Sequence, residues 1–121
     1  MDIEKTKEYY RNLNEKDLCD CVYCRNYIGQ IRTAYPKISN LLQDIGVDIT
    51  KPFETIPLDP DENNIVEYIA AQYVVFGDKE DFECIKSDDV IINIAQNYPS
   101  TEMKEPHFVV EIHPIFLKML K

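Results

Sequence analysis

The sequence predicts an α+β fold in which an N-terminal kinked helix packs on an antiparallel sheet of about four strands. Two patterns indicate this fold: one apolar helical stripe between residues 23 and 46, and strand-like apolar runs between residues 53 and 112. The strands follow one another without intervening helices, which favours an antiparallel meander. We expect residues 1–121 to form a single domain, because that length is enough to bury a core.

The N-terminal segment predicts a short helix behind Asp2, a residue type that caps helix N-termini. Its apolar residues recur at helical spacing: Ile3, Tyr10 and Leu13. The run at residues 8–11 suits an edge strand equally well, so both structures remain open for this segment.

The strongest helical pattern runs from Tyr23 to Gly46. Its apolar side chains step by four and three residues in alternation and form one face: Tyr27, Ile31, Ala34, Ile38, Leu41 and Ile45. Pro36 falls inside this stripe, where it removes a backbone donor and crowds the preceding turn. Because the stripe stays in phase through the proline, we expect one kinked helix or two coaxial pieces, ended by Gly46.

The rest of the chain predicts strands at residues 53–58, 65–76, 90–95 and 108–112. The second strand is apolar on both alternations, which is typical of a central strand covered on both faces. The polar segment 59–64 imitates a calcium loop, but Asn64 stands where that loop needs glycine, so we expect a turn. The apolar tail, residues 115–120, is expected to close one end of the core.

Three cysteines stand within six residues, directly before the strong helical pattern: Cys19, Cys21 and Cys24. The Cys-x₂-Cys spacing of the last two suits two ligands of one zinc ion, and the first is a third candidate. A tetrahedral site needs a fourth ligand, and three residues of suitable type remain: Cys84, His107 and His113. The predicted metal set is Cys19, Cys21, Cys24 and Cys84, with either histidine as an alternative to the last.

Two other interpretations of the cysteines are open. Cys-x₂-Cys at a helix start is also the arrangement of thioredoxin-like redox proteins, although Asp17 and Asp20 oppose a lowered thiol pKa. Free cysteines are also among the most buried residue types, so all three can be packing residues. Iron–sulfur spacing does not occur. The spacing favours a metal, zinc first, over packing and over redox chemistry.

The last predicted strand carries a polar face with two histidines. His107, Val109, Glu111 and His113 share this face by strand alternation. Such a face can bind a metal or relay protons. We interpret it as the solvated side of an edge strand.

The net charge of −9 is unevenly distributed. Residues 1–46 carry seven basic and seven acidic side chains, whereas residues 47–121 carry six basic and fifteen acidic ones. This field repels phosphate backbones, so we expect no nucleic-acid or anionic-membrane binding by the C-terminal part. It suits a basic protein partner or a cation, and a charged surface that favours solubility is the simpler explanation.

The sequence contains no apolar run of the roughly 18 residues that a membrane span needs. The first residues lack the basic start and apolar stretch of a secretory signal. We therefore expect a cytoplasmic protein whose thiols stay reduced.

The run from Asp17 to Tyr27 contains Cys-x-Cys-x₂-Cys-Arg-Asn-Tyr, and the segment from Gly46 to Glu54 follows it. Both resemble a family of small uncharacterised proteins from anaerobic Gram-positive bacteria. The resemblance extends over most of the chain. It implies a bacterial, cytoplasmic protein and brings no catalytic residue with it.

The sequence predicts a non-enzymatic protein-interaction module with a structural metal site at Cys19, Cys21 and Cys24. The alternative is a thiol-dependent redox or metal-handling protein that uses Cys21 and Cys24. No nucleophile elbow and no phosphate-binding glycine loop occurs, and no catalytic residue is predicted. The two hypotheses differ in exposure, because a structural site is closed whereas a redox pair must be accessible.

Overall fold

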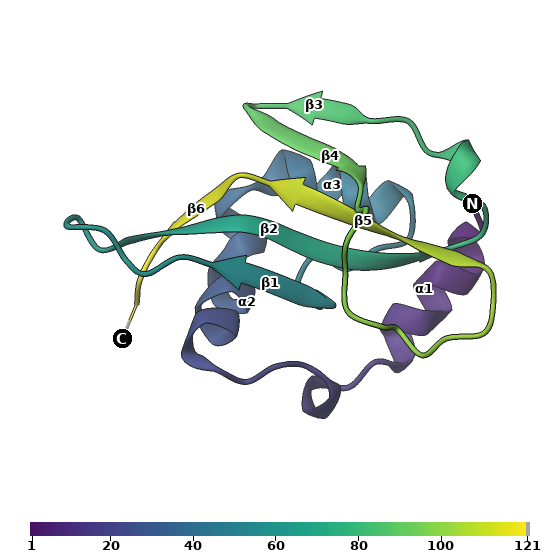
Figure 1. Cartoon of the computed structure of the whole chain (residues 1–121), viewed down its shortest axis with the longest axis horizontal. Coiled ribbons are helices and arrows are strands. Elements are labelled where there is room, and N and C mark those ends of the chain that lie inside the picture. The colour runs from purple at the N-terminus through teal and green to yellow at the C-terminus, as the bar shows by residue number, and fades with distance from the viewer. Residues whose placement is uncertain (121) are drawn as a thin grey trace.

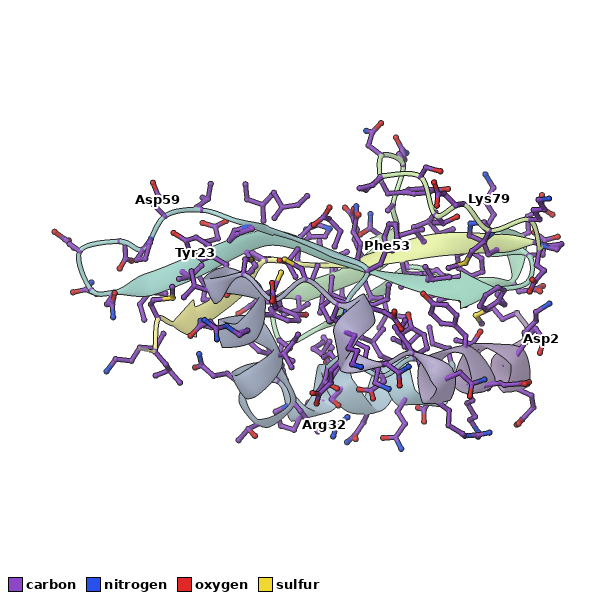
Figure 2. The ribbon with its side chains drawn as sticks, turned by 90° about the horizontal axis from the view of Figure 1, so that it is seen from below. Asp2, Tyr23, Arg32, Phe53, Asp59 and Lys79 are labelled. Carbon is purple, nitrogen blue, oxygen red and sulfur yellow. The ribbon has the colours of Figure 1, made fainter. Side chains whose placement is uncertain are left out.

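The computed structural model describes residues 1–120 and has two layers, with three helices on one side of a six-stranded antiparallel sheet (Figures 1 and 2). The helices are α1 Ile3–Asn12, α2 Val22–Ala34 and α3 Pro36–Asp44. The strands are β1 Glu54–Pro57, β2 Ile65–Phe76, β3 Ile85–Ser87, β4 Val90–Ile94, β5 His107–His113 and β6 Ile115–Lys118. The predicted α+β class is confirmed, with six strands instead of about four. Lys121 lies outside the described residues.

Helix α1 confirms the helical alternative for the N-terminal segment. The Asp2 side chain caps it, and the Asp2 backbone N–H donates to the Phe76 carbonyl at 2.8 Å. The buried Thr6 hydroxyl accepts from the Phe76 N–H at 3.0 Å, and the Tyr10 hydroxyl donates to the Val74 carbonyl at 2.8 Å. These bonds between distant parts of the chain hold α1 against the end of β2.

The predicted kinked helix is two helices that meet at Tyr35. This residue has non-helical dihedral angles, φ −129° and ψ 63°, and Pro36 occupies the first turn of α3. A proline fits there because the first N–H groups of a helix have no partner within it. The two helices run in different directions in both views, so they are not coaxial (Figures 1 and 2).

The buried side chains of α2 and α3 follow the predicted stripe in part. Ile31 of α2 is fully buried, as the stripe predicts. In α3 the stripe residue Ile38 and its neighbour Leu42 are fully buried, whereas Leu41 is partly buried. The stripe therefore predicts the core positions Ile31 and Ile38 correctly, whereas Ala34 is exposed and Leu42 is buried in place of Leu41.

Helix α3 ends in a Schellman motif, which is the arrangement expected of Gly46. The Gly46 N–H donates to the Gln43 carbonyl and the Val47 N–H donates to the Leu42 carbonyl, both at 3.0 Å. Gly46 has a φ of +90°, a conformation that L-residues rarely adopt. Val47 and Leu42 both belong to the core, so the motif also anchors the loop that follows α3.

Strand β2 is the centre of the sheet, whose order is β1-β2-β5-β4-β3. Along one edge of β2, β5 pairs with residues 71–76 and β6 pairs with residues 65–68. The short strand β3 is not indicated by the sequence, and β6 is the apolar tail that was expected to close the core. The core cluster lies between the sheet and the helices and includes residues of all three helices.

The loop between β4 and β5 covers part of the second face of the sheet (Figure 1), whereas Ile69 of β2 is exposed. Gln72 of β2 donates to the carbonyl of Asn97 in this loop at 2.9 Å. Val74 and Val109, which alternate with core-facing residues, are fully buried. Residues 70–76 of β2 are buried on both faces, which accounts for the apolar character of both alternations there. No helix within residues 1–120 is both long and apolar enough to cross a membrane.

Candidate metal centre

Cys19, Cys21 and Cys24 lie together at the N-terminal end of α2. Their sulfur atoms all lie within 4.8 Å of one another. Three sulfurs that bind one zinc ion at about 2.3 Å each stand about 3.8 Å apart in a tetrahedron. Small side-chain rotations are enough to reach that spacing, so the cluster can hold a metal ion.

The local sequence brings these sulfurs together in two steps. A 3₁₀ turn, Glu15–Asp17, follows α1 and is closed by a reciprocal cap between Asn14 and Asp17. Cys21 is the N-cap of α2, and its sulfur accepts from the Cys24 backbone N–H at 3.4 Å. One helical turn separates the two residues, so their side chains lie on the same side of the helix.

The three thiols have different environments. Cys19 and Cys21 are exposed, whereas Cys24 is buried and its sulfur lies 3.3 Å from the Thr55 hydroxyl of β1. Burial raises the pKa of the Cys24 thiol to about 12. The hydrogen bond from the Cys24 backbone N–H lowers the pKa of the Cys21 thiol. Desolvation opposes this shift in pKa, and the hydrogen bonds to the Cys21 sulfur outweigh it.

A small cavity of about 10 Å³ lies between the cluster and β1. Cys19 and Cys24 line it on one side, and Glu54 and Thr55 line it on the other. This volume is about that of one water molecule or one ion. The contact with Thr55 could not be predicted, because no local signal in the sequence pairs the start of α2 with β1.

The structure does not bring Cys84, His107 or His113 to the cluster. Within residues 1–120, the group of close ligand atoms consists of the three N-terminal cysteines. Cys24 contacts β1, whereas Cys84 directly precedes β3 at the opposite edge of the sheet. Four strand spacings separate those edges, which is roughly 19 Å. The chain therefore brings together three of the four ligands that the sequence predicts.

Both histidines have other partners. His113 Nε2 lies 2.9 Å from Asn93 Oδ1, and His107 Nε2 lies 2.7 Å from the Thr101 hydroxyl. The edge position predicted for their strand is wrong, because β4 pairs with β5 on the side away from β2. Val109, on the same face, is fully buried under the β4–β5 loop rather than solvated.

No protein-family model, curated protein or solved structure matches the chain. The class of protein is therefore described from the fold and the site alone: it is a small α+β domain with a cluster of three thiols at a helix start. The resemblance to proteins of anaerobic Gram-positive bacteria stays a prediction.

Proposed function

We propose that the protein is a non-enzymatic interaction module whose three cysteines bind a soft metal ion, zinc in the first instance. The observation that carries the proposal is the position of three sulfur atoms within 4.8 Å of one another. Thiolates are soft ligands that favour Zn²⁺ and Cu⁺. A closed structural zinc site has four protein ligands, whereas this chain gathers three.

The fourth coordination position is then open to a ligand from outside the chain. Two of the three cysteines, Cys19 and Cys21, are exposed, so a second molecule can reach the metal. A cysteine or histidine of a partner protein would complete the tetrahedron. The acidic excess of residues 47–121 favours a basic partner. Binding of the partner protein would thus depend on the presence of the metal ion.

Metal titration tests the proposal. We expect one Zn²⁺ or Co²⁺ ion per chain, and at least about a tenfold loss of affinity on Cys21→Ser, because serine is a poor ligand at neutral pH. Affinity should rise with pH, since burial holds the pKa of Cys24 at about 12 and binding must release that proton. Cobalt absorption, which reports thiolate ligation, and isothermal titration measure both effects.

Cys84→Ser is the matched control, because Cys84 is also exposed but lies outside the cluster. It should bind the ion as the unchanged protein does. A loss of affinity in this variant would contradict the open fourth position and favour Cys84 as the fourth ligand. Equal affinity of Cys21→Ser and the unchanged protein would refute the metal centre.

A second candidate function, disulfide exchange, is favoured by the opposite environments of two thiols. The pKa of the exposed Cys21 is lowered, and that of the buried Cys24 is raised to about 12. The Cys21 thiolate would attack a substrate disulfide, and Cys24 would then resolve the mixed disulfide after losing its proton. The substrate disulfide is reduced to two thiols while the Cys21–Cys24 disulfide forms.

Alkylation with iodoacetamide at varied pH tests this candidate in a variant that retains Cys21 and Cys24 and carries serine at positions 19 and 84. A lowered pKa places more thiolate at a given pH, so Cys21 should react at lower pH than free N-acetylcysteine does. Cys24 should react after unfolding, because it is 6% exposed. Mass spectrometry locates the adducts. Reaction of Cys21 at the same pH as N-acetylcysteine would count against disulfide exchange and leave the metal proposal standing.

A further inference from the structure

A pocket of about 550 Å³ opens on the helical side of the molecule, away from the cysteines. It lies between α1, α3 and the loop of residues 46–51. Four basic side chains and one carboxylate line it: Lys7, Arg11, Arg32, Lys51 and Asp48. The whole chain has 13 basic and 22 acidic side chains and is negatively charged, whereas the side chains that line this pocket carry a net positive charge. We name these four basic residues the cationic pocket set.

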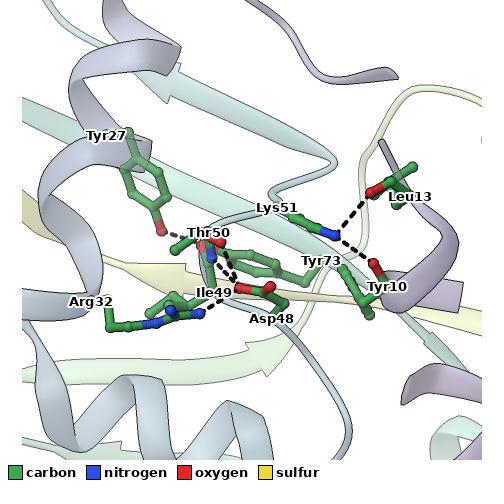
Figure 3. A network of polar contacts seen from close by, with 9 residues as sticks. All are labelled: Tyr10, Leu13, Tyr27, Arg32, Asp48, Ile49, Thr50, Lys51 and Tyr73. Atoms are coloured by element: carbon green, nitrogen blue, oxygen red, sulfur yellow. Dashed lines mark hydrogen bonds and ion pairs between the residues drawn. The ribbon is translucent and has the colours of Figure 1, made fainter. Parts of the chain in front are cut away.

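One oxygen of the pocket's only carboxylate, Asp48, already accepts three hydrogen bonds. Asp48 Oδ1 accepts from Arg32 Nη2 at 2.9 Å, from the Thr50 backbone N–H at 2.9 Å and from the Thr50 hydroxyl at 2.6 Å (Figure 3). The Tyr73 hydroxyl donates to the Ile49 carbonyl at 2.7 Å and holds the same loop from the core side. Asp48 therefore orients Arg32 and cancels one of the four positive charges.

Lys51 is also held in place, by the end of α1. Its ammonium group donates to the Tyr10 carbonyl at 2.6 Å and to the Leu13 carbonyl at 2.8 Å (Figure 3). Carbonyls at a helix C-terminus lack partners within the helix, so this lysine satisfies them. An ammonium group has three donors, and one of the three remains for a ligand.

The other two members of the cationic pocket set have weak or no ion pairs. Arg11 forms no ion pair within the described residues 1–120. The ammonium group of Lys7 lies 3.7 Å from Glu4 on the exposed surface of α1, a pairing that contributes little. Lys7 and Arg11 are four residues apart and so lie on the same side of α1. Both side chains are available to a bound anion.

We propose that this pocket binds a small molecule that carries a phosphate group. Its volume lies in the range of small-ligand sites. Arginine forks bind phosphate oxygens through paired hydrogen bonds, and lysine adds charge. Ser39, Asn40 and Gln43 of α3 line the remaining wall and can bind hydroxyl groups of an attached organic part. A nucleic acid is excluded, because the acidic surface elsewhere repels a polyanion.

Titration with ribose 5-phosphate, inorganic phosphate and citrate tests the proposal. A chelator is included so that no ion at the cysteines contributes. We expect saturable one-site binding of the sugar phosphate, weaker binding of citrate, and about a tenfold loss on Arg11→Gln. Arg11 is exposed, so its replacement leaves the fold intact, as a melting curve verifies. Lys16→Gln is the matched control, since Lys16 is an exposed cation outside the pocket, and it should bind normally.

Each result decides the proposal. Inorganic phosphate that binds as tightly as the sugar phosphate supports the phosphate site and identifies the free ion as the ligand. Citrate that binds as tightly as both phosphates overturns the phosphate assignment in favour of a general anion patch. Equal losses in Arg11→Gln and Lys16→Gln, or no saturable binding of either phosphate, also overturn it.

Discussion

The Ile31→Asp variant is expected to be unfolded at room temperature. Ile31 has no exposed surface and belongs to the core that joins α2 to the sheet. A buried carboxylate without a partner costs several kcal/mol, which is comparable with the roughly 5–15 kcal/mol that stabilises a small domain. Far-ultraviolet circular dichroism and a thermal melting curve measure the effect. If this variant melted as the unchanged protein does, the face of α2 that carries Ile31 would not face the core.

Leu41→Asp is the matched comparison, because both residues belong to the predicted apolar stripe. Leu41 is partly buried, so its aspartate keeps access to water and should cost about 1–2 kcal/mol. This variant is expected to fold and to melt at a moderately lower temperature. Unfolding of both variants would contradict the partial exposure of Leu41.

The Gly46→Ala variant is expected to lose about 3 kcal/mol of the free energy of unfolding. Gly46 has a φ of +90°, and a Cβ atom there would lie 2.7 Å from the Ile3 carbonyl oxygen and 3.1 Å from the Lys7 backbone nitrogen. Both atoms belong to the backbone of α1, so a side-chain rotation cannot relieve the contact. The loss should appear as a lower midpoint of urea unfolding, without a change in slope.

Gly29→Ala is the control for this substitution. Gly29 lies within α2, and a Cβ atom there would meet no atom within 4 Å. Alanine is the better helix former, so this variant should gain up to about 1 kcal/mol. If the two glycine variants showed equal stability, the close packing of α1 on the end of α3 would be wrong.

The cysteine cluster was predictable because it depends on neighbouring residues. Cys19 and Cys21 lie just before α2 and Cys24 lies in its first turn, so their spacing in sequence largely determines their spacing in space. Cys84 is different, because its distance from the cluster depends on the strand order. The cationic pocket set joins α1, α2 and a loop, and no local pattern relates Arg11 to Lys51.

The sequence by itself determined the α+β class, the cap at Gly46 and the position of β2, whereas it left a helix and an edge strand open for the segment that forms α1. Each depends on periodicity or on a single backbone preference, which are local properties. The tertiary structure alone decided the angle between α2 and α3, the insertion of β5 between β2 and β4, and the pairing of β6 with β2. These features bury apolar area between segments that are far apart in the sequence. The total buried area depends on how all the segments pack together, so no single segment reveals it.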